Sequence, residues 1–178
     1  MRAPPESIAL AFCALLVTGA ARHSPAPVSD ALRSVAQRAE RNLVGAGEEM
    51  PAEKYGFKPT PAQMSFGEVI AHLTEGNDFL CSKIGGVAPP KRAKLTASAA
   101  KPELLEHLKE SFRFCDSALA KVTDSQLDAK VPFFEGGQVS RAAAMFAATE
   151  DWADHYSQLA IYLRLNGLLP PTAKNRTG

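Results

Sequence analysis

Apolar residues recur in steps of three and four along four separate segments, and this spacing most limits what the chain can fold into. It puts the apolar side chains of each segment on one helix face, and four such faces can bury one another in a single core. The segments begin near Ser29 or Asp30, Ser65, Pro102 and Ser140. Strand-like alternation of useful length is not found. The pattern predicts an all-α fold, a four-helix bundle with a long second connection.

Local signals mark the ends of these helices. Ser65, followed three residues later by Glu68, has the spacing of a capping box and predicts the start of the second helix. Gly85 and Gly86 end that helix, and a connection rich in Pro, Lys and Ala follows over residues 87–101. Residues 131–138 contain a proline, two phenylalanines and a glycine pair, which predicts an irregular excursion or a small hairpin.

The first residues have the pattern of a signal peptide. Arg2 precedes an apolar run of about ten residues, Ile8 to Val17, and small residues follow it. The run is too short to span a bilayer, so we expect removal of residues 1–21, export to the periplasm or the exterior, and no membrane association afterwards. Residues 22–28 are then a linker, 29–171 the bundle and 172–178 a disordered tail.

Two cysteines, Cys81 and Cys115, remain after removal of the signal peptide. In an exported protein they can pair, because disulfides persist in oxidising compartments. They can equally pack as two buried thiols on neighbouring helices, since free cysteine behaves as a small apolar residue. The sequence leaves both alternatives open.

The charge balance argues against several functions. Charged residues make up 22% of the chain and the formal net charge is +1, so no attraction for nucleic acid phosphates is expected. There is no glycine-rich phosphate loop, no Cys-x-x-Cys pair and no nucleophile elbow. A nucleic acid partner is therefore not predicted, and a small-molecule substrate is.

The last helical segment carries two polar residues on an apolar face. Asp151 and His155 are four residues apart, which places their side chains about 6 Å from each other at the stems. A buried unpaired carboxylate is costly, so something must compensate Asp151. One interpretation is a divalent metal ion held with His72 of the second helix, and this donor set suits Zn, Ni, Fe or Mn. The alternative is a simple Asp151–His155 pair, with His72 at the edge of the core.

Three stretches of the chain resemble the DinB-like family of bacterial four-helix bundles, which includes thiol-dependent transferases. They are the run from Met50 to Pro61, the block Ser65-Phe-Gly-Glu-Val-Ile-Ala-His72 with Asn77 after it, and the block from His155 to Pro171. The resemblance implies a metal site of three histidines, one on the second helix and two spaced by four on the last. These map onto His72, Asp151 and His155, so this chain has aspartate where the family has its middle histidine.

The resemblance implies a metal-dependent hydrolase or thiol-dependent transferase of unknown substrate. Aspartate is a competent ligand for zinc and for harder divalent ions, so metal binding can survive the departure at Asp151. The alternative is a non-catalytic helical interaction module whose metal site has decayed. A homodimer is compatible with either function.

Overall fold

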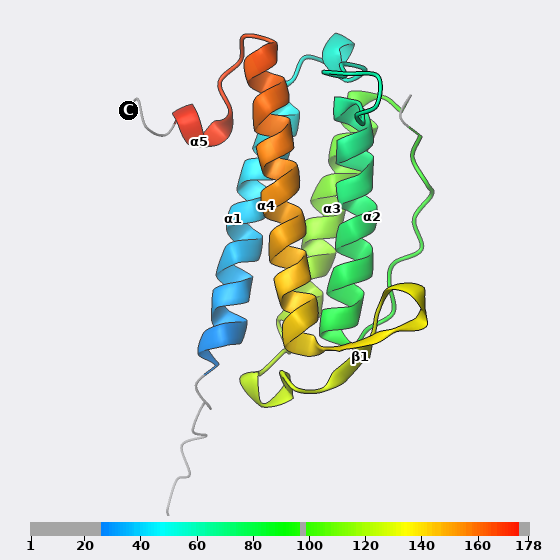
Figure 1. Cartoon of the computed structure of the whole chain (residues 1–178), viewed down its shortest axis with the longest axis vertical. Helices are drawn as coiled ribbons and strands as arrows, with labels where there is room; N and C mark the ends of the chain where they lie inside the picture. Colours follow the sequence, from blue (N-terminus) through cyan, green and yellow to red (C-terminus); the bar gives the residue numbers. More distant parts are fainter. Residues whose placement is uncertain (1–25, 97–98, 175–178) are drawn as a thin grey trace, which may run out of the picture.

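The computed structural model describes residues 26–96 and 99–174, and four long helices lie side by side in it (Figure 1). They are α1 (Pro27–Glu49), α2 (Phe66–Gly85), α3 (Lys101–Leu119) and α4 (Arg141–Leu165). The predicted all-α bundle with a long second connection is confirmed. The predicted signal peptide, and the linker up to residue 25, lie outside the described residues.

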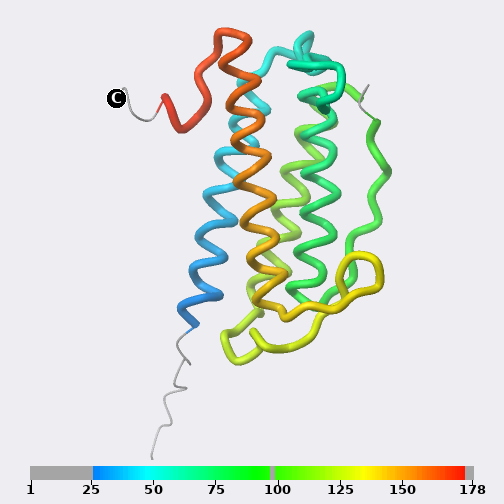
Figure 2. Tube along the Cα trace, in the orientation of Figure 1, coloured from blue at the N-terminus to red at the C-terminus, as the bar shows by residue number. Residues whose placement is uncertain are grey.

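Each long helix packs mainly against two others. α2 contacts α3 and α4, and α1 contacts the same two helices, so α1 and α2 face each other diagonally across the bundle. Figure 2 shows the near-parallel alignment of the four axes. The apolar stripes predicted from the sequence meet along the centre, where the largest fully buried side chains are Tyr162, Phe66, Phe112, Leu43, Met50, Ile70, Leu73, Ile84, Leu104, Leu108, Leu119 and Leu159. Among the described residues, no helix is long and apolar enough to cross a membrane.

The start of α2 follows from local sequence, whereas the start of α1 does not. The Ser65 side chain accepts from the Glu68 amide and Glu68 accepts from the Ser65 amide, which is the predicted capping box. The first helix begins at Pro27, slightly earlier than the expected start near Ser29 or Asp30, and no local side chain caps it. The carboxylate of Asp124, distant in sequence, accepts from the amides of Val28 and Ser29 at 3.0 and 2.9 Å and takes the place of a local cap.

A small antiparallel hairpin crosses one end of the bundle. Strands β1 (Lys130–Pro132) and β2 (Gln138–Ser140) pair with Val131 opposite Val139, and the tip contains the 3-10 turn η3 (Phe134–Gly136). Further short turns are η1 (Ala52–Lys54) and η2 (Asp124–Gln126). Of the two alternatives for residues 131–138, the hairpin is the one formed.

The chain stays ordered beyond the point where a disordered tail was expected. Residues Pro171–Lys174 form the short helix α5. The Thr172 amide donates to the Tyr156 hydroxyl at 3.0 Å, and Lys174 pairs with Glu49 at 2.6 Å. These contacts hold α5 against α4 and α1, so the prediction of a disordered tail is wrong for residues 172–174.

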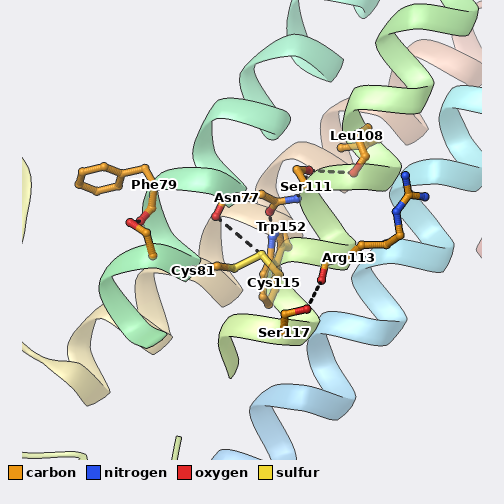
Figure 3. The surroundings of a disulfide bond; sticks show 10 residues. Asn77, Phe79, Cys81, Leu108, Ser111, Arg113, Cys115, Ser117 and Trp152 are labelled. Carbon is orange, nitrogen blue, oxygen red and sulfur yellow. Dashed lines mark hydrogen bonds between the residues drawn. A yellow bond between two sulfur atoms is a disulfide. The ribbon is translucent and has the colours of Figure 1, made fainter. Parts of the chain in front are cut away.

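Cys81 of α2 and Cys115 of α3 form a disulfide in the interior of the bundle (Figure 3). Their Cα atoms are 5.1 Å apart, and both side chains are fully buried. Of the two alternatives that the sequence leaves open, the structure has the paired one.

Candidate metal site

The three side chains singled out in the sequence meet between α2 and α4. His72 comes from α2, and Asp151 and His155 come from successive turns of α4. Each offers one ligand atom, and these atoms all lie within 4.8 Å of one another. In the described part of the chain, this is the one place where three His, Cys, Asp or Glu side chains are close enough to hold an ion. The spacing of four on α4 thus produces the predicted convergence.

The carboxylate of Asp151 is only half satisfied. Its Oδ1 lies 3.4 Å from Nε2 of His155, but its Oδ2 is buried and has no hydrogen-bond partner among the described residues. Gly76 of α2 leaves the space for this oxygen, because a Cβ at that position would lie 3.3 Å from Oδ2. A buried carboxylate oxygen without a partner is costly, so the site is built for a further positive or hydrogen-bonding group.

His155 is held from behind by a chain of hydrogen bonds. Its Nδ1 lies 3.2 Å from Oε1 of Gln158, and the Gln158 amide nitrogen donates to the Tyr162 hydroxyl at 3.0 Å. That hydroxyl donates to the Met64 carbonyl at 2.9 Å, which fixes the orientation of the amide. With its proton on Nδ1, His155 leaves the lone pair of Nε2 free for a cation that lies between it and Asp151, as a histidine ligand requires.

The pKa of His155 is raised above its usual value. The hydrogen bond to Asp151 is the largest cause and outweighs burial, which acts in the opposite direction. The cluster therefore attracts positive charge to this position, either a proton on His155 or another cation.

His72 forms the solvent side of the cluster. Its ring meets that of His155 edge to face, with centroids 4.9 Å apart, and the residue is exposed. His72 thus lies at the rim of the cluster, with its ring against the buried His155. An exposed ligand beside a buried pair leaves one side of the cluster open to small molecules.

A buried polar network sets the relative position of α2, α3 and α4 next to the cluster (Figure 3). Trp152 Nε1 donates to Oδ1 of Asn77 at 2.6 Å, and the Asn77 amide nitrogen donates to the Ser111 hydroxyl at 2.9 Å. Asn77 and Trp152 directly follow Gly76 and Asp151 in the chain. By joining these neighbours, the network holds the Asp151 carboxylate against Gly76.

The donor set fits a divalent ion. Two imidazoles and one carboxylate are ordinary zinc ligands, and ligand atoms around a tetrahedral ion lie roughly 3–3.5 Å apart. The observed limit of 4.8 Å is slightly wider, so side-chain rotations of His72, which is exposed, can close the difference. The unpartnered Asp151 oxygen would then gain a partner. The fit supports a three-ligand site with an open position.

Comparison with known families identifies the chain. The sequence profile described as the DinB superfamily matches residues 35–159, which includes all three residues of the cluster. The chain belongs to the DinB superfamily.

Solved structures show the fold shared within this superfamily. A DinB-like protein from Bacillus subtilis is 20% identical, with a TM-score of 0.63, and the match covers 77% of this chain and 92% of that one. A DinB-like protein from Bacillus cereus is 14% identical, with a TM-score of 0.66, covering 80% and 95%. The mycothiol-dependent maleylpyruvate isomerase is 12% identical, with a TM-score of 0.60; the match covers 74% of this chain and 60% of the isomerase. No curated protein matches the chain in sequence.

Sequence reasoning found the three members of the cluster but missed the residues that position them. Gly76 was not singled out, although glycine inside a helix usually marks a close approach. The bond from Trp152 to Asn77 depends on how α2 and α4 are aligned, which the sequence does not show. Gln158 lies three residues after His155 on the same helix, so local spacing is the signal for its contact with the imidazole.

Proposed function

We propose that this DinB superfamily member is an exported metal-dependent enzyme, a hydrolase or thiol-dependent transferase acting on a small molecule. The observation that carries the proposal is the Asp151 oxygen, buried without a partner inside a cluster of three potential ligands. Isolated pairing with His155 leaves this oxygen uncompensated, whereas a cation between the three side chains compensates it. The structural likeness to a mycothiol-dependent isomerase supports thiol chemistry as one of the two reaction classes.

The residues of the chain have distinct roles in this proposal. His72, Asp151 and His155 hold the ion, and Gln158 orients His155 through Nδ1. A bound divalent ion would lower the pKa of a thiol or of a water coordinated to it, so that either becomes a usable nucleophile near neutral pH. Because His72 is exposed, a substrate reaches the cluster from the α2 side without rearrangement of the buried pair.

The disulfide supports the proposed location. A buried Cys81–Cys115 bond is expected in a protein that folds in an oxidising compartment and is unusual in reducing cytosol. This agrees with the signal peptide pattern of the first residues. If the protein is exported, only thiols present outside the cytosol can serve as its cosubstrate. Export therefore favours water over a thiol as the nucleophile that the metal activates.

A second candidate is the non-catalytic interaction module with a decayed site. The contact of 3.4 Å between Asp151 and His155 favours it, because the pair can persist without an ion. The raised pKa of His155 lets a proton provide the positive charge instead. The two candidates differ in whether a metal binds at all.

Thermal unfolding with and without metal separates the candidates. An ion bound at a hundred times its Kd stabilises the native state by about 2.7 kcal/mol, which corresponds to a rise of roughly 8 °C in Tm for a domain of this size. Zn²⁺ and Ni²⁺ are added separately to the mature protein, and a chelator reverses the rise. The variant with His72→Ala and His155→Ala should lose the response, while the matched control His107→Ala on α3 should keep it. If the Tm of the wild-type protein is the same in metal and in chelator, the metal-dependent enzyme is excluded and the non-catalytic interaction module remains.

A further inference from the structure

A hollow lies on the outer side of α2, apart from the ligand cluster. Its volume is about 380 Å³, and it is lined by residues of α2, α3 and the connection that follows α2. Most of its wall is apolar, including Ala71, Phe79, Leu95 and the pair Pro89 and Pro90. The metal site does not account for this space, and we refer to it as the α2 groove.

Ion pairs attach the middle of the connection that covers the groove to α2 and α3. Arg92 Nε donates to Oδ2 of Asp78 at 2.7 Å, and its Nη1 pairs with Glu110 of α3. Lys94 lies 3.6 Å from Glu75. Arg92 and Lys94 are thus paired, whereas Asp78 Oδ1 stays buried without a hydrogen-bond partner among the described residues. Because the rest of the wall is mainly apolar, the space favours an apolar occupant.

The ring of Phe79 lies at one end of the groove. Phe79 stacks on Phe134 of the hairpin tip, with centroids 4.5 Å apart and planes 20° apart, and Phe133 lies at 6.0 Å. Phe79, which lines the groove, thus forms an aromatic wall at this end, and the hairpin packs against its ring.

The other end leads to the ligand cluster. A second hollow of about 280 Å³ has His72 in its wall and shares Ala71, Glu75 and Leu95 with the α2 groove. From His72 to Phe79 the helix rises about 10 Å, at 1.5 Å per residue. A ligand with one end at His72 can thus extend along α2 to the aromatic wall.

We infer that the substrate is an amphiphile whose reacting polar head lies at the ligand cluster and whose apolar tail, about 10 Å long, lies in the α2 groove. The inference rests on the proposed function, since it takes the cluster as the place of the head. It names the substrate class as molecules with a medium-length acyl, alkyl or aryl chain, and it excludes small hydrophilic substrates. Leu95 and Ala93 of the connection are the residues that contact the tail from outside.

A series of n-alkyl hydroxamates tests this, because the head binds zinc and only the tail varies. Acetohydroxamate and octanohydroxamate are titrated by calorimetry into the zinc-loaded mature protein. Burial of a methylene raises affinity by up to about fourfold, so half of full burial over the six added methylenes gives roughly sixtyfold. Leu95→Asp and, as a second variant at an exposed position, Ala93→Trp should each remove most of this gain. Ala93→Trp, which lies outside the hollow at His72, should also leave acetohydroxamate binding unchanged. Ala143→Trp on the exposed start of α4 is the matched control and should keep the gain.

The outcomes separate this inference from the function on which it rests. If the protein takes up no zinc, and so binds neither hydroxamate through it, the proposed function fails. If acetohydroxamate binds but the longer tail adds less than about threefold, the groove inference is overturned, since burial should give far more. A gain that persists in both Leu95→Asp and Ala93→Trp overturns it too, because the tail then lies elsewhere.

Discussion

The Cys81–Cys115 disulfide should contribute a large part of the stability of the bundle. The two residues are 34 positions apart, and the loop entropy removed from the unfolded chain by a cross-link of this span corresponds to about 4 kcal/mol. For a domain of this size, 1 kcal/mol shifts Tm by about 3 °C, so loss of the bond should lower Tm by roughly 12 °C. The bond joins α2 to α3 beside Asn77, so both helices lose their covalent link near the cluster (Figure 3).

Equilibrium unfolding in urea measures this effect. The mature protein is unfolded and refolded with and without a phosphine reductant, because the buried sulfurs are reached only when the chain opens. The variant Cys81→Ala with Cys115→Ala is the control, and its midpoint should not respond to reductant. Equal midpoints for the wild type in both conditions, together with two free thiols in the unfolded unreduced protein, would refute the reasoning.

Three further predictions concern α2 and its surroundings. Gly76→Ala should preserve or raise stability through helix propensity, yet weaken zinc binding about tenfold in calorimetry because its Cβ crowds the Asp151 carboxylate; unchanged affinity would contradict this. The hydrogen bond from the Ser65 amide lowers the pKa of Glu68 to about 2, so its stabilisation is present above its unfolded pKa of about 4.5 and is lost as pH falls toward 2. In urea unfolding, the stability gap between wild type and Glu68→Gln should shrink from pH 6 to pH 3; a constant gap would count against this. Arg92→Leu leaves the partly buried carboxylate of Asp78 on α2 without its ion-pair partner and should lower the unfolding free energy by about 2 kcal/mol; a loss below about 0.5 kcal/mol would show that the ion pair is unimportant.

The sequence sufficed for features that depend on near neighbours. Apolar spacing located the four helices, and Ser65 with Glu68 located the start of α2, because a capping box is complete within four residues. Asp151 and His155 converge because they lie one turn apart on a single helix. These relations do not depend on how the helices pack.

Features that join distant segments could not be predicted from the residues alone. The α1 cap comes from Asp124, and α5 is held by partners on α4 and α1. Cys81 and Cys115 can pair only if α2 and α3 are rotated so that the two side chains face each other, and the sequence does not fix this rotation. His72 was named from the residues as the candidate third ligand, and the family resemblance gave the same residue. Whether it meets Asp151 and His155 depends on the register of α2 on α4, which is a tertiary property.

Metal content of the mature protein tests the central claim most directly. The protein is purified without exposure to chelator, and its metals are measured by mass spectrometry alongside the variant with His72→Ala and His155→Ala. The structure predicts a stoichiometric divalent metal in the wild type and its loss in the variant, because the variant retains only the Asp151 carboxylate of the cluster. A wild type without stoichiometric metal, or a variant with the same content, would contradict the assignment of this cluster as a metal site.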